Sequence, residues 1–180
     1  MKLAITFVLM TLSPIVHPAA ATPEQPKLLR ESYWSDITEA ERDYFVYLPP
    51  EFESRETWPV ILFLHGNGER GDGKAELPYV LKHGPLFEAW CQKRDLPFVI
   101  ISPQLPMFGM GDVPYIRDRA PDEIPERKDE GIHAYPPNYR GSDPMAGQMS
   151  EPSSYPPEGL PDGWPRIEGE LLAMIDRVVE

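Results

Sequence analysis

The stretch "VILFLHGNGERGDGK", Val60 to Lys74, is the most informative about fold and function. An apolar run ends there in His-Gly, and three more glycines follow. Three known motifs can be laid over it. "GNGERG" matches the G-x-G-x-x-G turn of dinucleotide-binding folds, "GERGDGK" matches the G-x-x-x-x-G-K of a P-loop, and "HGNG" matches the His-Gly-rich turn that supplies an oxyanion hole in esterases. At most one of these can be correct, and the surrounding sequence has to discriminate between them.

The first residues are typical of a signal peptide, which we place at residues 1–21. Lys2 forms a short basic region, Leu3–Leu12 is apolar, and Ala19–Ala21 offers an A-x-A cleavage site. The apolar run is interrupted before it reaches the roughly 20 residues that a membrane span needs. We therefore expect a secreted or periplasmic protein, cleaved near Ala21 and without stable membrane insertion.

Composition excludes several classes of partner. The 180 residues suffice for one domain, and 29 acidic against 17 basic residues give a formal charge of −12. Nucleic acid and anionic membrane surfaces both favour Lys and Arg patches, so neither is an expected partner. Cys91 is the only cysteine, which excludes an intramolecular disulfide and a cysteine-rich metal site. Its apolar surroundings predict a packed core thiol. No cofactor or metal is expected.

Three strands are predicted, at about residues 44–48, 59–65 and 98–102, and they indicate an α/β fold. The second and third are continuous apolar runs, as expected in a parallel sheet that is covered on both faces. Helical pieces are expected between them, over residues 75–84 and 85–96. Strand, glycine turn, helix and strand together form a βαβ unit.

Residues 22–102 make up this α/β part, and the composition changes after it. Residues 103–165 contain 13 prolines and seven glycines, which bar regular elements of any length. We interpret this segment as an insertion, either a lid over the site or a partly disordered stretch. His133 has no partner at ligand spacing and is read as a surface residue. The aromatic side chains of the insertion could line a pocket or attach the loop to the body; they are Tyr115, Tyr135, Tyr139, Tyr155 and Trp164.

Residues 166–180 predict an amphipathic helix that closes the chain. Its apolar stripe needs a sheet to cover. The stripe consists of Ile167, Leu171, Leu172, Ile175, Val178 and Val179.

The two phosphate motifs fail on their surroundings. A P-loop needs Ser or Thr after its lysine to hold Mg²⁺, but Ala75 stands there, so Lys74 is read as an ordinary solvated residue. A dinucleotide turn needs a helix that begins within the glycines and an acidic residue at the end of the next strand. That strand ends instead at Pro103 and Gln104. An exported protein also meets little cytosolic nucleotide.

The oxyanion motif has a matching context. In α/β-hydrolases the loop after the third strand places a backbone N–H beside the nucleophile, where it stabilises the oxyanion of the tetrahedral intermediate. The array "YFVYLPP…WPVILFLHGNGERG…LKHGP…LPFVIISPQ" resembles the secreted carboxylesterases of that fold, the polyhydroxybutyrate-depolymerase and feruloyl- or acetyl-esterase-like group, also labelled predicted peptidases. The resemblance covers Asp43 to Gln104 and resumes from Trp164 to Glu180.

This resemblance implies the N-terminal part of an α/β-hydrolase sheet, interrupted by the Pro-rich insertion, and particular roles in the loop. Carried over by position, Asn67 gives its backbone N–H to the oxyanion, and Gly66 and Gly68 shape the turn. His65 is expected to pack or hydrogen-bond beneath the loop rather than act as a base. Glu69 and Arg70 are expected to pair with each other or to tie the loop to the body, without acting in catalysis.

The nucleophile is not found, because the 180 residues contain no G-x-S-x-G. In the resembled family the final helix, here residues 166–180, leads into the strand before that motif. We therefore expect either a fragment that stops before the catalytic serine or a degenerate relative. The expected parent is a secreted serine hydrolase that cleaves small, plant-derived or polyester-derived carboxylic esters through an acyl-enzyme. A non-catalytic secreted binding module and a prolyl-oligopeptidase-type peptidase are the alternatives, and the oligomeric state is left open.

Overall fold

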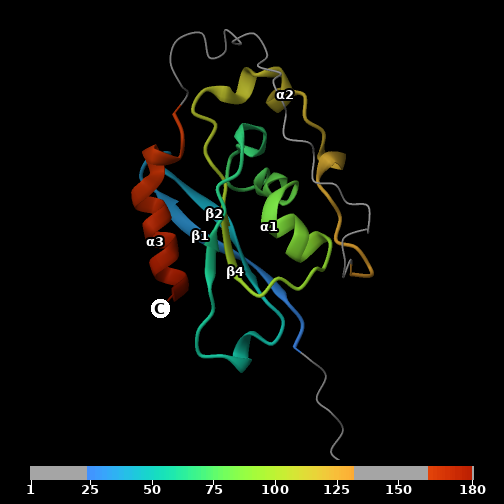
Figure 1. Ribbon diagram of the computed structural model, residues 1–180. Helices are drawn as coiled ribbons and strands as arrows, with labels where there is room; N and C mark the ends of the chain where they lie inside the picture. Colours follow the sequence, from blue (N-terminus) through green and yellow to red (C-terminus); the bar gives the residue numbers. More distant parts are fainter. Residues whose placement is uncertain (1–23, 132–161, 180) are drawn as a thin grey trace, which may run out of the picture.

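A mixed four-stranded sheet forms the middle of the structure, a computed structural model that describes residues 24–131 and 162–179 (Figure 1). The strands lie in the order β1-β2-β4-β3. β1 and β2 are antiparallel, β2 and β4 are antiparallel, and β3 and β4 are parallel. The α/β class predicted from the sequence is confirmed. The predicted signal peptide, residues 1–21, lies outside the described residues.

A long hairpin, β1 (Lys27–Ser35) and β2 (Ala40–Leu48), forms one side of the sheet. β2 contains the predicted strand 44–48 and begins earlier. β1 was not predicted, because only part of it is buried and its charged residues hide the alternation that marks a strand. Its partly covered residues fit its place as the edge strand beside β2.

The parallel pair is formed by β3 (Val60–Leu62) and β4 (Val99–Pro103). β4 is buried along its whole length, as its apolar sequence predicts. The expectation that the strand at 59–65 is covered on both faces is wrong. β3 is shorter and ends the described sheet, so Val60 and Leu64 are each 39% exposed.

The connection between β3 and β4 packs on one face of the sheet. It is a series of short turns rather than one long helix: 3₁₀ turns at Asn67–Glu69 and Leu77–Leu81, then α1 (Gly84–Leu86), which continues as a π-helical turn at Phe87–Cys91. The two predicted helical pieces are therefore present in shortened form. Cys91 is buried among apolar side chains, which confirms the predicted core thiol, and burial raises its pKa to about 11.

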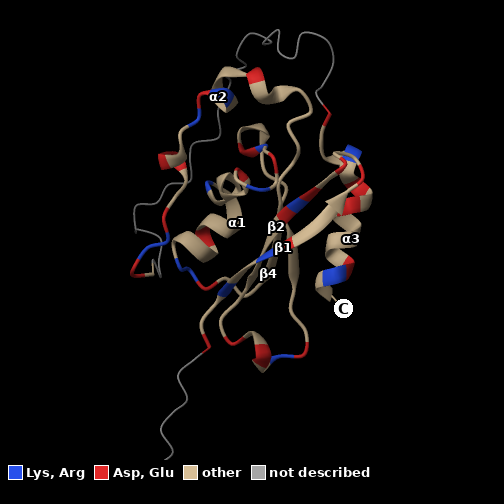
Figure 2. Ribbon diagram, turned by 180° about the vertical axis from the view of Figure 1, so that it is seen from behind, with Lys and Arg blue, Asp and Glu red and all other residues tan. Residues whose placement is uncertain are grey.

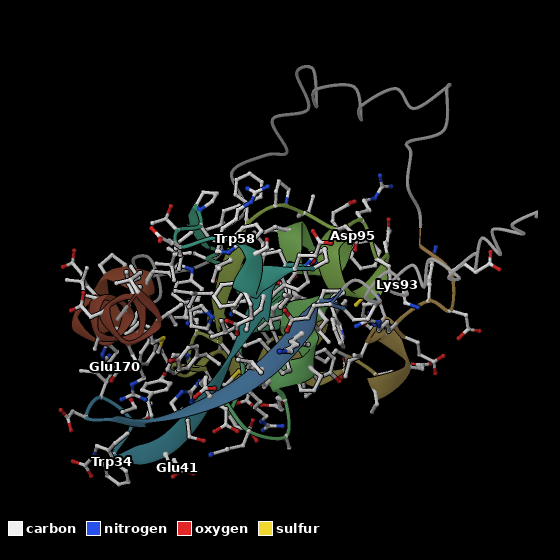
Figure 3. The ribbon with its side chains drawn as sticks, turned by 90° about the horizontal axis from the view of Figure 1, so that it is seen from below. Trp34, Glu41, Trp58, Lys93, Asp95 and Glu170 are labelled. Atoms are coloured by element: carbon white, nitrogen blue, oxygen red, sulfur yellow. The ribbon has the colours of Figure 1, made fainter. Side chains whose placement is uncertain are left out.

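The opposite face is covered by α3 (Glu168–Val179), which follows a 3₁₀ turn at Trp164–Ile167. The two helical layers lie on either side of the sheet in the view of Figure 3. Glu170 on α3 reaches the end of the hairpin, where the Ser35 hydroxyl donates to its carboxylate at 2.8 Å. The helix thus connects the last described residues to the first strand.

The face that α3 buries differs in part from the predicted stripe. Ile167 and Leu171 are buried as expected, and Met174 joins them in the core. Leu172 and Val179 are 57% and 59% exposed, so their placement in the stripe was wrong. The reason is geometric: a face that includes 167, 171 and 174 leaves residue 172 about 100° away on a 3.6-residue helix.

The predicted insertion, residues 103–165, is described up to residue 131 and again from 162. The described part contains α2 (Pro114–Arg117) and 3₁₀ turns at Met110–Asp112 and Pro121–Glu123. Four of its residues discussed above lie outside the described part: His133, Tyr135, Tyr139 and Tyr155.

Charged positions of both signs are interspersed along the described ribbon (Figure 2). Within residues 24–131 and 162–179, no helix combines the length and the apolar character that a membrane span requires.

Candidate functional site

The glycine loop lies at the carboxyl end of the parallel strand pair. It follows β3 directly, and the segment after β4 runs beside it, so that the Gly71 N–H donates to the Leu105 carbonyl at 3.0 Å. In open α/β sheets ligands bind outside the carboxyl ends of the strands. The loop is therefore placed where this class of fold builds its sites.

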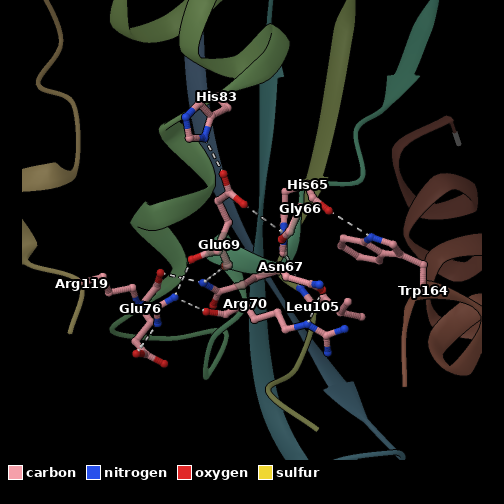
Figure 4. A network of polar contacts seen from close by, with 12 residues as sticks. His65, Gly66, Asn67, Glu69, Arg70, Glu76, His83, Leu105, Arg119 and Trp164 are labelled. Carbon is pink, nitrogen blue, oxygen red and sulfur yellow. Dashed lines mark hydrogen bonds and ion pairs between the residues drawn. The ribbon is translucent and has the colours of Figure 1, made fainter. Parts of the chain in front are cut away.

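His65 holds the base of the loop. Its Nε2 accepts a hydrogen bond from the Leu105 N–H at 2.9 Å, and its Nδ1–H donates to the Gly66 carbonyl at 2.6 Å. The Trp164 ring packs edge-on against the imidazole, with the ring centroids 4.9 Å apart (Figure 4). Burial lowers the pKa of His65 to about 4, so the ring is neutral at pH 7. With both nitrogens occupied, His65 is a structural residue rather than a base.

Arg70 lies beneath the loop and is only 1% exposed. Its guanidinium donates to the Pro106 carbonyl at 3.0 Å and to the Asp162 carbonyl at 2.7 Å, and its Nε donates to the Asn67 side-chain oxygen at 3.0 Å. The loop after β3, the segment after β4 and the approach to α3 are thereby joined through one side chain. This agrees with the expectation that Arg70 ties the loop to the body.

Gln104, also buried, explains two of the four glycines. Its Nε2 donates to the Glu69 carbonyl at 2.8 Å, and its Oε1 accepts from the Gly73 N–H at 2.8 Å. A Cβ at Gly71 would lie 2.4 Å from Gln104 Nε2, and Gly73 has a φ of +69°. These glycines are needed for packing against Gln104 and for the turn, not for a phosphate.

Unlike Gly71 and Gly73, Gly66 and Gly68 stand at positions where the backbone does not require glycine. Gly66 has φ −81° and ψ −177°, an extended conformation that any residue adopts. A Cβ on Gly68 would meet no described atom within 4 Å. The space beside the turn is therefore open.

Asn67 is the exposed first residue of the 3₁₀ turn. The backbone N–H groups of Asn67 and Gly68 donate to no other residue in the described part of the chain. Two adjacent N–H groups without a partner, on a turn held from below by buried hydrogen bonds, can donate to an oxygen that carries developing negative charge. The three predicted site residues, Gly66, Asn67 and Gly68, thus form one turn, of which Gly66 and Asn67 are exposed and Gly68 is partly covered.

A pair formed by Glu69 and His83 was not anticipated from the sequence. Glu69 is 7% exposed, and its Oε1 lies 2.5 Å from Nδ1 of His83 (Figure 4). Its other oxygen lies 4.0 Å from Nδ1 of His65. The imidazole of His83 is 68% exposed. The only signal was "LKHGP", which the resemblance included without giving His83 a role.

Arg119, from the predicted insertion, closes the loop from the other side. It donates to the Gly68 carbonyl at 3.0 Å and to the Arg70 carbonyl at 2.5 Å, and it pairs with Glu76 at 2.5 Å. Its contribution could not be foreseen, because 49 residues separate it from the backbone that it binds.

The phosphate motifs find no support in the geometry. Lys74 pairs with Asp43 at 2.5 Å and with Glu41 at 2.6 Å, which corrects its prediction as an ordinary solvated lysine. Across the described ranges, no group of three or more His, Cys, Asp and Glu is arranged to hold a metal ion. None of the described serine hydroxyls contacts His65 or His83.

No protein-family model and no curated protein matches this sequence.

Proposed function

We propose that this chain carries the oxyanion-hole loop of a secreted serine hydrolase that cleaves carboxylic esters through an acyl-enzyme. The observation that carries the proposal is that the backbone N–H groups of Asn67 and Gly68 have no partner among the described residues, on a turn whose supporting side chains are buried. Donors fixed in advance stabilise the tetrahedral intermediate without reorganisation during the reaction.

The position of the loop supports the same proposal. It follows β3, the third strand in chain order, which is where α/β-hydrolases place an oxyanion donor. A serine nucleophile needs a base within hydrogen-bond reach. No described serine has a histidine at that distance, so we place the nucleophile outside the described part of the chain. A serine presented by a strand that pairs with the open edge of β3 would come close to the Asn67 turn, because both follow the carboxyl end of the sheet.

Asn67→Pro tests the backbone donor directly. Proline removes the backbone N–H together with the side chain that accepts from Arg70, and it suits this position, because Asn67 begins the turn and Gly66 before it is extended. In protein produced from the complete reading frame, we expect N67P to lower kcat for p-nitrophenyl butyrate about 10²- to 10³-fold. The control N67A keeps the N–H and loses only the bond to Arg70, so it should stay within a few-fold of the parent.

Two results would contradict the proposal. One is a folded N67P protein with unchanged kcat. The other is a complete protein whose ester turnover resists a serine-directed phosphonate. Reading the coding sequence beyond Glu180 adds a further check: a strand followed by G-x-S-x-G within about 20 residues supports the esterase, and a stop codon supports the binding module.

A further inference from the structure

A cleft of about 410 Å³ lies between the glycine loop and α2. Its walls include Gly68, Glu69, Lys82, His83, Tyr115 and Arg119.

Most charged groups around the cleft are already paired. Lys82 lies 2.5 Å from Glu123, and Arg119 is held by Glu76 and by two backbone carbonyls. Asp118 pairs with its neighbour Arg117 at 2.7 Å. The exception is Nε2 of His83, which has no hydrogen-bond partner in the described part of the protein.

The Glu69 carboxylate fixes the orientation of that imidazole. Glu69 is buried, and the 2.5 Å contact at Nδ1 assigns the Nδ1 proton to the pair. The Nε2 lone pair is then directed away from Glu69, on a ring that is mostly open to solvent. A carboxylate that holds an imidazole in one tautomer while the other nitrogen faces a substrate is the arrangement of a reactive histidine.

We propose that His83 is a nucleophile for activated acyl groups bound in this cleft, with Glu69 as its positioning residue. This inference does not require a serine and goes beyond the proposed function. The preferred substrates are aryl esters of acidic phenols. The phenolate of such an ester leaves more readily than imidazole does, and it departs without first being protonated. An acyl group in the cleft also lies beside the backbone of Gly68, which forms part of its wall.

The reaction has two steps. Nε2 of His83 attacks the acyl carbon, the bond from that carbon to the aryl oxygen breaks, and the phenolate leaves with the bonding pair. The acyl-imidazolium passes its Nδ1 proton to the Glu69 carboxylate and becomes a neutral acyl-imidazole. Water then attacks the acyl carbon while Glu69 returns the proton to Nδ1, and the C–N bond breaks with its electron pair going to Nε2. The products are the carboxylic acid, one proton released to solvent and the neutral imidazole. No oxidant, metal or other co-reactant is consumed.

The test uses the 180-residue chain, treated with a serine-directed phosphonate, and measures release of p-nitrophenolate from p-nitrophenyl acetate. We expect turnover to continue and H83Q to lower its second-order rate constant about tenfold. This effect is smaller than the roughly 10²- to 10⁴-fold that a positioned acid or base contributes, because the ring is exposed. H133Q, the same substitution at a histidine outside the described residues, should leave the rate unchanged.

Rapid acid quenching followed by mass spectrometry should locate the acetyl group on the peptide that contains His83. E69Q keeps an acceptor oxygen but removes the charge, so we expect it to reduce the rate less than H83Q does. E69A also removes the acceptor, so we expect it to reduce the rate more than E69Q does. Equal rates for H83Q and the parent, with both folded by circular dichroism, would overturn the inference. Complete loss of parent activity after phosphonate treatment would also overturn it, because the turnover would then come from a serine rather than from His83.

Discussion

Arg70→Met is the sharpest test of how the candidate site is held. The substitution removes the guanidinium but keeps an unbranched side chain in its place. It leaves the Pro106 and Asp162 carbonyls and the Asn67 side-chain oxygen without this donor. Only the Pro106 acceptor is buried, and leaving it without a partner costs about 1–3 kcal/mol; the other two bonds are part-buried and add less, and part of the total is recovered because no charge has to be desolvated. We expect the free energy of unfolding to fall by about 3 kcal/mol.

This loss is large compared with the total stability of a domain, about 5–15 kcal/mol. For a chain of this length it corresponds to a fall of about 10 °C in Tm, measured by circular dichroism. R117M provides a matched control, because Arg117 and its partner Asp118 are 56% and 60% exposed. Such a surface pair contributes at most about 1 kcal/mol. If R70M and R117M lower Tm equally, the buried hydrogen bonds of Arg70 do not hold the loop as argued.

Two further predictions concern the same loop. His65 has a folded pKa of about 4, below its usual value of 6.5, so the unfolded chain takes up this proton first as the pH falls. The stability that His65 confers is complete above pH 6.5 and declines by up to about 3 kcal/mol between pH 6.5 and pH 4; urea titrations should show a flatter profile for H65Q, and parallel profiles would contradict this. Gly71→Ala places a Cβ against buried Gln104, so we expect a loss of about 1–3 kcal/mol. Gly68→Ala enters open space and should change the unfolding free energy by less than about 0.5 kcal/mol; equal urea midpoints for the two variants would refute the packing argument.

The strands that the sequence predicted best are those whose burial is continuous. β4 carries an unbroken apolar run and is fully buried, so its local pattern is sufficient. β1 depends on pairing with β2 for its register, and its own pattern is weak. The predicted stripe was correct at Ile167, in the turn before α3, and at Leu171, but wrong at Leu172, because composition cannot distinguish neighbouring faces of a helix when both carry leucine.

The position of the glycine loop was predictable, but the contacts that support it were not. An apolar strand followed by His-Gly identifies a turn at the end of a strand. The partners of that turn come from distant segments: Arg119 binds the Gly68 carbonyl across 51 residues, and Arg70 binds the Asp162 carbonyl across 92. Such contacts exist only after the chain has folded, and no local periodicity encodes them. For the same reason the pairing of Glu69 with His83 was not foreseen.

The distribution of polar groups around the loop is itself an argument about function. Three polar side chains, His65, Glu69 and Arg70, are buried beneath it at a cost in desolvation. Their hydrogen bonds are made to the base of the loop and to its neighbours, whereas the N–H groups of Asn67 and Gly68 at the tip have no partner within the described residues. Every helical turn leaves its first N–H groups without a partner inside the turn, so what distinguishes this one is the buried support beneath them. Rigid support below unpaired donors is what preorganised stabilisation of an oxyanion requires, and this contrast is the strongest physical support for the proposed hydrolase.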